Sequence, residues 1–185
     1  MISNTTTSVS QVAEIIADKN IVALFQGRGE AGPRALGNRS ILYDPRDPNG
    51  KDHVNTIKKR EDYRPFAGSV MLEHAHDWFD MRGLKESPYM MYAVNVLETK
   101  KQSIPCITHV DGTCRVQTVT RNQNQNYYDL INAFYKITGV PILFDTSLNL
   151  AGEPIVHSLE EAIRVLQNSE IKYLYLPESQ ELFTK

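Results

Sequence analysis

The chain has 185 residues, of which 41% are hydrophobic, 23% charged and 9% aromatic, and its formal net charge is −2. This length suits one domain with its own core, and the composition excludes disordered and disulfide-built proteins. No apolar run approaches the roughly 20 residues that a membrane span needs, and the slight negative charge excludes a surface that is basic throughout.

Helical and extended patterns alternate along the first third of the chain. An apolar face predicts a helix over residues 8–18, and the run IVALF at 21–25 predicts a buried strand. A second strand is expected at 40–45, where Pro45 ends it, and a helix at 51–60.

The same alternation continues to the end of the chain. Gly139 is placed to end a helix over 126–138, and Ser158 with Glu161 makes a capping-box pattern at the start of another. The other expected segments are a strand passing into a helix at 70–80, a strand at 90–98, a hairpin at 107–120 that turns at Asp111-Gly112, a strand at 141–149 and a final strand at 171–176. Strands and helices interspersed in this way indicate an α/β domain with a mixed sheet.

A loop rich in glycine and arginine follows the first buried strand. The stretch FQGRGEAGPRALGNRS, at 25–40, holds three arginines and four glycines in sixteen positions. Glycines let backbone N–H groups face an anion, and Arg28, Arg34 and Arg39 add planar donors suited to phosphate or carboxylate. The alternative is a surface turn whose arginines pair with local acids, but Glu30 is the one acid in the stretch. We therefore predict an anion site, which is not a Walker A loop because the Gly-Lys-Ser/Thr ending is missing.

Positive charge is concentrated around this loop. Residues 28–64 hold nine of the 20 Lys and Arg residues and six of the 22 Asp and Glu residues, a balance of +3, against −5 for the rest of the chain. A positive segment on an acidic body suits a compact polyphosphate or carboxylate ligand better than a long duplex.

Two further motifs are weak when each is taken alone. Lys58, Arg60 and Arg64 precede or flank a rigid bend at Pro65, but such a run is often a solvated charged surface. The stretch TSLNLAGEP at 146–154 offers neutral hydrogen-bonding groups, but it could be a polar loop bonded to its own side chains.

Together the two motifs are specific. Lys-x-Arg-x-x-x-x-Pro at 58–65 and Ser-x-Asn-x-x-Gly-x-Pro at 147–154 resemble the YrdC-type nucleotide-binding fold. The stretches GRGEAGPRALGNRSIL, NTIKKREDYRPFA, SPYMMY, THVDGTCRVQTV and TGVPILFDTSLNLAGEPIV are similar, in that order, to the C-terminal domain of NodU/CmcH/TobZ-type O-carbamoyltransferases. The resemblance implies an open, twisted mixed sheet with flanking helices and a concave nucleotide site. We assign residues 20–185 to this domain and residues 1–19 to its N-terminal segment and first helix.

The resemblance also implies a reaction. In this family the YrdC-like domain makes carbamoyl-adenylate from carbamoyl phosphate and ATP, with Mg²⁺ carried on the ATP phosphates and no metal site of its own. A separate, larger domain of the actin/sugar-kinase-like type, holding an iron site, then passes the carbamoyl group to a hydroxyl. Because the chain begins with its own Met and ends soon after the YrdC-like part, we expect it to deliver carbamoyl-adenylate to a partner subunit of that type.

Carried over by motif, the resemblance implies two sets of site residues. The catalytic set, which stabilises charge as the acyl-phosphate bond forms, is Lys58, Arg60, Arg64, His109 and Arg115. The set that binds nucleotide or substrate is Arg28, Arg34, Asn38, Arg39, Ser87, Asp111, Thr113, Thr146, Ser147 and Asn149. The chain departs from the family at Gly68, where Pro is usual, at Asp145, where Asn is usual, and at Leu148, where Phe is usual. A carboxylate at 145 would repel a phosphate unless it meets Mg²⁺ or points away.

Two other functions stay open, a nucleic-acid-binding module that uses the positive segment and a nucleotide-binding regulatory domain without turnover. His74 and His76, two residues apart, point to different sides of a helix, so a metal site there is not expected. Cys106 and Cys114 are expected to be free and buried, because the start of the chain lacks a signal-peptide pattern and the protein is therefore expected in the cytoplasm. Trp78, Phe79 and the tyrosines at 127, 128, 173 and 175 are expected in the core.

Overall fold

One mixed sheet organises the molecule. The computed structural model describes residues 2–30, 34–61 and 63–185, and these contain ten strands in the order β1-β10-β9-β2-β3-β8-β4-β7-β6-β5. The strands are β1 (Ser3–Thr6), β2 (Val22–Phe25), β3 (Arg39–Tyr43), β4 (Ala67–Met71), β5 (Phe79–Asp80), β6 (Tyr92–Val96), β7 (Thr113–Val119), β8 (Ile142–Ser147), β9 (Tyr173–Leu176) and β10 (Glu181–Thr184). The pairs β2–β9 and β4–β7 are parallel and the other ladders are antiparallel, so the prediction of a mixed sheet is confirmed.

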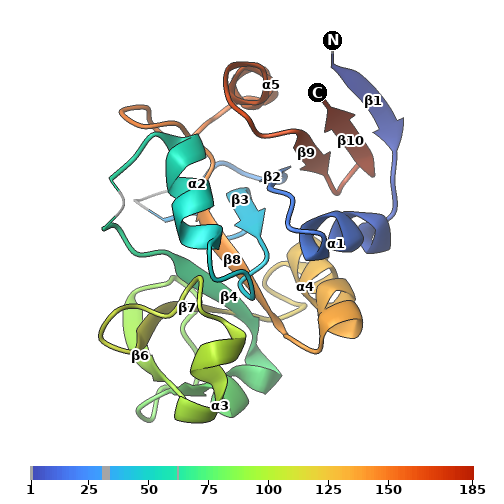
Figure 1. Cartoon of the computed structure of the whole chain (residues 1–185). Helices are drawn as coiled ribbons and strands as arrows, with labels where there is room; N and C mark the ends of the chain where they lie inside the picture. The colour runs from blue at the N-terminus through green and yellow to red at the C-terminus, as the bar shows by residue number, and fades with distance from the viewer. Residues whose placement is uncertain (1, 31–33, 62) are drawn as a thin grey trace.

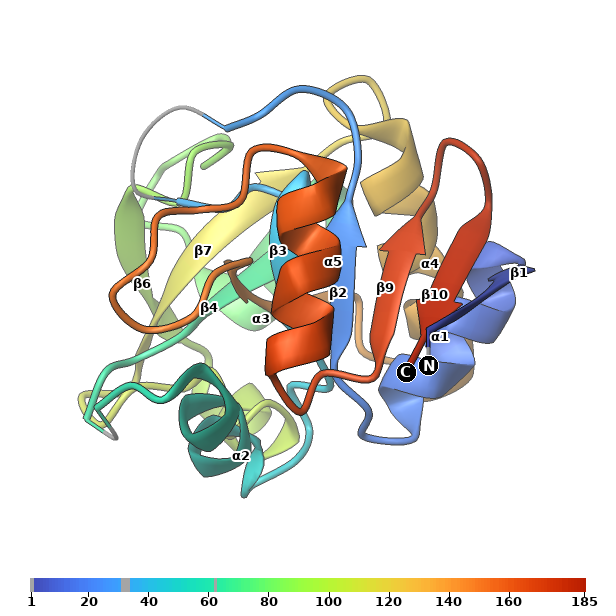
Figure 2. The same cartoon turned by 90° about the horizontal axis from the view of Figure 1, so that it is seen from above.

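Helices flank this sheet on both faces. They are α1 (Val9–Ala17), α2 (Gly50–Lys58), α3 (Ala75–Trp78), α4 (Gln125–Thr138) and α5 (Leu159–Asn168), with short 3₁₀ turns η1 (Leu72–His74) and η2 (Glu98–Ser103). Figure 1 shows α1 and α4 packed together on one side, and Figure 2 shows α5 crossing the opposite face of β2 and β3. The sheet is thus covered on both faces, as a largely buried sheet requires.

Local signals in the sequence explain where the helices begin and end. Ser158 accepts from the backbone N–H of Glu161, whose side chain bonds back, so the predicted capping box opens α5. Gly139 ends α4 in the left-handed region at φ 73°, as predicted. The apolar faces of α1 and α4 are fully buried, and each buried Leu, Ile or Phe side chain contributes about 1.5–3 kcal/mol.

The sheet differs from expectation at its edges and at one hairpin. The strand at 173–176 is not the final one, because β10 follows it and pairs with β1, which lies in the polar opening of the chain. The hairpin expected over 107–120 is wrong, because β7 pairs instead with β6 and β4. The Asp-Gly turn itself exists, with the N–H of His109 bonded to the carbonyl of Thr113 at 2.7 Å and Gly112 at φ +79°.

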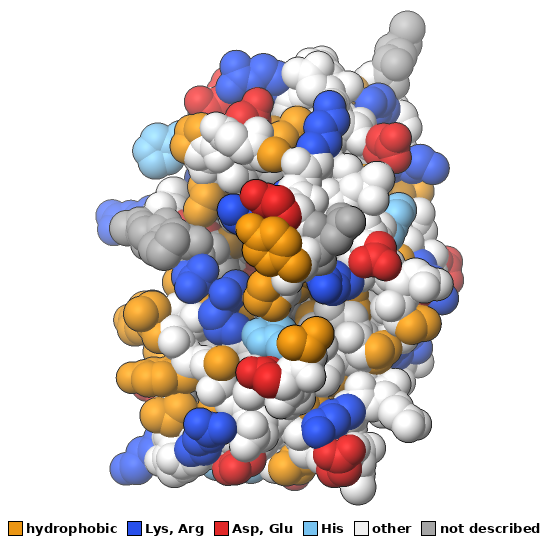
Figure 3. Space-filling view, turned by 60° about the vertical axis from the view of Figure 1, so that its left-hand side comes forward, with side chains coloured by type: hydrophobic (Ala, Val, Ile, Leu, Met, Phe, Trp, Pro, Cys, Tyr) orange, Lys and Arg blue, Asp and Glu red, His pale blue; other side chains and the backbone are white. Residues whose placement is uncertain are grey.

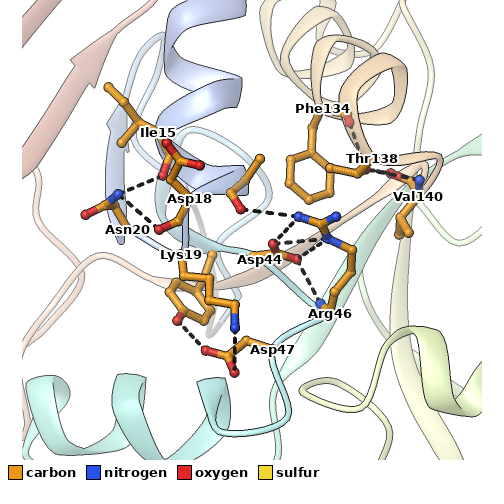
Figure 4. A network of polar contacts seen from close by, with 12 residues as sticks. Ile15, Asp18, Lys19, Asn20, Asp44, Arg46, Asp47, Phe134, Thr138 and Val140 are labelled. Carbon is orange, nitrogen blue, oxygen red and sulfur yellow. Dashed lines mark hydrogen bonds and ion pairs between the residues drawn. The ribbon is translucent and has the colours of Figure 1, made fainter.

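A buried polar network fixes the start of α2, the helix that carries Lys58. Asp44 is fully buried and forms a two-pronged ion pair with Arg46, which also donates to the carbonyl of Ala17 at 3.3 Å (Figure 4). Tyr43 donates to Asp47 at 2.7 Å, and burial raises the pKa of that phenol well above its usual value. The network ties the end of α1 to the turn that enters α2.

The other residues singled out from the sequence have structural contacts. Cys106 and Cys114 are free and buried, as expected. His74 lies 3.5 Å from Asp77 and packs its ring against Tyr135. Trp78, Phe79, Tyr127 and Tyr175 are buried in the core, whereas Tyr128 and Tyr173 are partly exposed. No helix within the described ranges is long and apolar enough to cross a membrane.

Candidate active site

The two weak motifs of the sequence meet at the end of α2. Lys58, only 3% exposed, donates from Nζ to the carbonyl of Ser147 and, at 3.0 Å, to Oδ1 of Asn149. The hydroxyl of Ser147 donates to the same Asn149 oxygen at 2.6 Å, and the N–H of Ala151 donates back to the carbonyl of Lys58. Residues 58 and 147 are 89 positions apart, so only the fold brings them together.

Burial leaves Lys58 poised between its charged and neutral forms. The loss of hydrating water, with added repulsion from Arg60, lowers the pKa of Lys58 to about 7, and Asp145 opposes this shift. An anion at this position would favour the ammonium form. A bound anion would therefore convert Lys58 from a partly neutral to a charged side chain.

Guanidinium groups that repel one another extend from this lysine through Arg60, and we call Arg34, Arg60, Arg64 and Arg115 the arginine cluster. The Nε atoms of Arg34, Arg60 and Arg115 are buried and have no hydrogen-bond partner within the described ranges. Burial, then repulsion from Arg64 and Arg115, lowers the pKa of Arg60, and burial, then repulsion from Arg34, lowers that of Arg115. Buried donors without acceptors are costly, so the arrangement fits an anion that carries several oxygens.

The backbone around Pro65 holds Arg60 in this arrangement. Its guanidinium stacks 4.3 Å above the ring of Phe66 and donates to the carbonyl of Pro65 at 3.1 Å. Lys59 adopts a left-handed conformation at φ 53° that ends α2 and redirects the chain at Arg60. Arg64 is half exposed and pairs with Glu61 at 2.9 Å.

Two hollows meet at Ser147 and Asn149, the hydrogen-bond partners of Lys58. One, of about 360 Å³, is lined by Lys58, Arg60, Arg64 and the 147–152 loop. The other, of about 460 Å³, is lined by Glu30 and by residues 153–157, and both share Ser147 and Asn149. On the face shown in Figure 3, basic side chains gather beside a histidine and several apolar side chains.

The predicted group His109, Asp111 and Thr113 forms one bonded unit next to this site. His109 bonds through Nε2 to the carbonyl of Phe66 at 2.8 Å and through Nδ1 to the hydroxyl of Thr113 at 3.1 Å. The carboxylate of Asp111 accepts from the hydroxyl and the N–H of Thr113, and these bonds hold its pKa below the usual value. Because a carbonyl can only accept, Nε2 of His109 carries a hydrogen.

The glycine-arginine loop contributes less to the site than the sequence suggested. Arg39 is 3% exposed and donates to the carbonyls of Gln26 and Asn38, with longer contacts to those of Gly27 and His157. Its guanidinium also stacks 3.7 Å above Phe25. Arg39 therefore holds the loop together, and its terminal nitrogens are not free for a ligand.

Glu30 bonds to the backbone of its own loop. Its Oε1 accepts from the backbone N–H groups of Leu36 and Asn38 at 2.7 and 2.8 Å and forms no ion pair with a described arginine. Burial raises the pKa of Glu30 despite these bonds. Arg28 is exposed on the same loop, and residues 31–33 of the predicted motif lie outside the described residues.

For Asn38, Ser87 and Thr146 the structure shows contacts with other parts of the protein. The Oδ1 of Asn38 accepts from Asn124 at 3.2 Å. The buried hydroxyl of Ser87 donates to the carbonyl of Val116 at 2.8 Å, so it attaches its segment to β7 instead of facing a ligand. Thr146 is half buried on β8, opposite Ile41.

Three residues that support the site were not predicted from the sequence. Phe66 lies under Arg60, Gln117 bonds to the loop at Leu36, and Tyr127 bonds to Asp145. Gln117 could have been found, because it stands two positions after Arg115 on one strand and so shares its face. Nothing in the local sequence marks the other two.

Comparison with known proteins identifies the family. The family described as Carbamoyltransferase C-terminus matches residues 13–181, nearly the whole chain. The chain belongs to this family. Nodulation protein NolNO of Sinorhizobium fredii is 51% identical over 88% of the chain, and 3'-hydroxymethylcephem-O-carbamoyltransferase of Streptomyces clavuligerus is 36% identical over 87%. The chain spans only 24% and 30% of the length of these two relatives.

Solved structures confirm the fold. P. abyssi Sua5 complexed with L-threonine covers 91% of the chain with a TM-score of 0.63 at 13% identity, the chain matching 46% of it. Full-length HypF in its phosphate- and nucleotide-bound form covers 95% with a TM-score of 0.55 at 16% identity, the chain matching 24% of it. The YrdC-like fold and the kinship with O-carbamoyltransferases expected from the motifs are thus confirmed.

Proposed function

We propose that this carbamoyltransferase-family domain forms carbamoyl-adenylate from carbamoyl phosphate and ATP. The observation that carries the proposal is the convergence of Lys58 and the arginine cluster, with buried Nε atoms that lack acceptors within the described ranges. Two phosphorylated substrates bring many anionic oxygens to one site, and this set of donors suits them. The kinship with carbamoyltransferases supplies the identity of the group that is activated.

The proposed reaction balances with water as a third reactant. Water cleaves carbamoyl phosphate into carbamate and inorganic phosphate. A carbamate oxygen then forms a bond to the α-phosphorus of ATP, and the bond between that phosphorus and the oxygen of the leaving pyrophosphate breaks. No covalent bond to the protein is needed, so the residues act by positioning and by stabilising charge.

Each residue of the site then has a defined task. Arg60, Arg115 and Arg34 bind the phosphate oxygens and stabilise the charge that develops at the α-phosphorus. Lys58, held by Ser147 and Asn149, adds a proton-bearing donor when the anions arrive. His109 and Asp111 line a hollow beside Phe66, where we place the carbamoyl end.

Mg²⁺ fits this scheme as a companion of ATP. Within the described ranges no group of three or more His, Cys, Asp or Glu residues could hold a metal ion. The protein therefore supplies mainly cationic donors, and the phosphates of ATP would carry the magnesium ion, which neutralises part of their charge.

Transfer to the final acceptor belongs to another part of the system. The relatives are three to four times longer than the chain, judged by the shares of their length that it spans. We propose that a separate domain or subunit, of the actin/sugar-kinase-like type, passes the carbamoyl group to a hydroxyl. A carbamoyl-adenylate hydrolyses readily, so direct delivery between the two parts is favoured.

The test is product formation by the chain alone. The purified protein would be incubated with Mg-ATP and carbamoyl phosphate, and mass spectrometry would detect carbamoyl-adenylate and pyrophosphate. We expect both products, together with exchange of labelled pyrophosphate into ATP that requires carbamoyl phosphate. Lys58→Ala should abolish both signals, whereas Lys136→Ala, which removes an exposed lysine at the end of α4, should leave them unchanged.

Two results would contradict the proposal. The first is the absence of adenylate and exchange even when the larger part of a relative is supplied in trans. The second is RNA binding with a steep salt dependence and no ATP binding, which would favour a nucleic-acid-binding module instead.

A further inference from the structure

We propose that Asp145 is held as a neutral carboxylic acid and that it positions the arginine cluster through a buried chain of hydrogen bonds. The side chain is 1% exposed and lies in the sheet below α4. Its Oδ2 lies 2.9 Å from the hydroxyl of Tyr127 and 3.0 Å from that of Ser69. It therefore points toward α4, which removes the clash with phosphate that the sequence suggested.

The chain of contacts continues from Ser69 to the arginine-rich loop. The hydroxyl oxygen of Ser69 also lies 2.9 Å from Oε1 of Gln117 on β7. The amide nitrogen of Gln117 then donates to the carbonyl of Leu36 at 3.2 Å, two residues after Arg34. Gln117 also stands two residues after Arg115 on the same strand. The chain thus connects α4 to the segments that carry two members of the cluster.

Counting hydrogens decides the state of Asp145. The Ser69 hydroxyl has one hydrogen but lies within bonding distance of two acceptor oxygens, those of Asp145 and Gln117. The Gln117 amide cannot be flipped, because its oxygen would then face the carbonyl of Leu36. An ionised Asp145 would therefore leave one pair of oxygens facing each other without a hydrogen.

A proton on Oδ2 satisfies every contact in this chain of hydrogen bonds. Asp145 then donates to Ser69, Ser69 donates to Gln117, and Gln117 donates to Leu36, while Tyr127 donates to Asp145. A neutral aspartic acid has nearly the shape of asparagine and, like asparagine, no net charge. Asp145→Asn therefore mimics the protonated side chain.

The surrounding charges also favour the neutral form of Asp145. Burial, and then the second buried carboxyl at Glu30, raise the pKa of Asp145 to about 7, against hydrogen bonds from Tyr127, Ser40 and Ser69. Two cations sense the charge of Asp145 from other elements, Lys58 at the end of α2 and Arg115 on β7. The balance places ionisation near neutral pH, where loss of the proton would break the link at Ser69.

The decisive experiment compares the wild type with Asp145→Asn by stability, which does not depend on the proposed function. A raised pKa in the folded state means that folding takes up a proton between the unfolded and folded values. The folding equilibrium constant of the wild type, relative to Asp145→Asn, should fall about tenfold per pH unit from pH 5 to pH 7 and level off above. Infrared spectra at pH 6 should also show a buried carboxylic-acid band that Asp145→Asn lacks. Parallel stability curves, or no such band, would show that Asp145 is ionised and would overturn the proposal.

The positioning role, which rests on the proposed function, has its own readout. Asp145→Ala breaks the chain and should raise the Kd of ATP about tenfold, the cost of a lost buried hydrogen bond, whereas Asp145→Asn should restore it to within about threefold. If Asn binds ATP as weakly as Ala, the neutral side chain does not position the cluster. Failure to form carbamoyl-adenylate in all three proteins would count against the proposed function alone, since binding and stability are measured separately.

Discussion

Two sets of arginines differ in how far the protein itself satisfies their donors. Arg39 and Arg46 are satisfied by the protein itself, Arg39 by backbone carbonyls and Arg46 by the carboxylate of Asp44. Arg115 keeps a buried Nε that has no acceptor within the described ranges, and Arg60 is intermediate, because its Nε is likewise unpaired there but a terminal nitrogen donates to the carbonyl of Pro65. The Nε of Arg39 also lacks one, but its other two nitrogens donate and its plane lies on Phe25.

This difference separates stability from function. An arginine whose donors are satisfied holds segments of the fold together, and its loss leaves buried carbonyls without donors. An arginine whose buried donor lacks an acceptor lowers the stability of the fold. Groups that are unfavourable for stability in this way are common in binding sites. Net charge along the sequence cannot distinguish the two sets, because it counts every arginine between residues 28 and 115 equally, whatever its contacts.

The largest expected effect comes from Arg115→Met, which tests the unsatisfied set. We expect carbamoyl-adenylate formation to fall by about 10²–10³-fold, the usual cost of losing one donor to a developing charge. The melting temperature should stay the same or rise slightly, since a half-buried cation whose Nε lacks an acceptor is removed without breaking an ion pair in the described residues. Initial rates and thermal unfolding would be measured on the same preparation, and a rate within threefold of wild type would exclude Arg115 from the site.

The matched change in the satisfied set is Arg39→Met. It removes the side-chain donor to the carbonyl of Gln26 and one of the two donors to that of Asn38, and should destabilise the fold by about 2–4 kcal/mol. We expect a large drop in melting temperature for Arg39→Met and no drop for Arg115→Met. Equal melting temperatures for the two variants would break the distinction between the sets.

How far the sequence predicts this structure depends on the range of the interaction. The end of α4 and the start of α5 were predicted because their capping signals are local. Gly139 ends α4, and Ser158 with Glu161 begins α5. The edge strand β1 was missed because its sequence SNTT is polar and all four residues are exposed, so only its ladder to β10 defines the strand. Strand pairing of this kind is not encoded in local periodicity.

Prediction of the site from the sequence meets the same limit, the contacts between residues far apart in the chain. The resemblance brought the motifs of Lys58 and Ser147 together, and the structure shows them bonded, but spacing alone could not have paired them. The different roles of Arg34 and Arg39, five positions apart, depend on which direction each side chain takes in the folded loop. The hydrogen-bonded place of Asp145 likewise depends on α4, which follows β7 in the chain and precedes β8.

A smaller effect should appear in the pH dependence of ligand binding, which tests Lys58 as part of the unsatisfied set. Its pKa is about 7 in the free protein, and a bound anion raises it, so binding takes up a proton between the two values. Affinity for pyrophosphate should therefore fall by up to about tenfold per pH unit above pH 7. Calorimetry at pH 8 in buffers with different ionisation enthalpies would measure the uptake, and Lys58→Met should remove that part of it. Equal uptake in both proteins would show that Lys58 does not meet the anion.

The smallest expected effect concerns Arg64, which stands between the two sets. It borders the hollow beside Lys58 but pairs with Glu61 at 2.9 Å, and both side chains are about half exposed, at 53% and 51%. An exposed pair of this kind contributes about 0–1 kcal/mol, so Glu61→Gln should leave stability nearly unchanged. If Arg64 belongs with Arg60 and Arg115, releasing it should tighten pyrophosphate binding about two- to threefold at low salt, and high salt should erase the gain. Unchanged binding at low salt would place Arg64 outside the site, because a guanidinium that faces the ligand must sense the loss of its competing carboxylate.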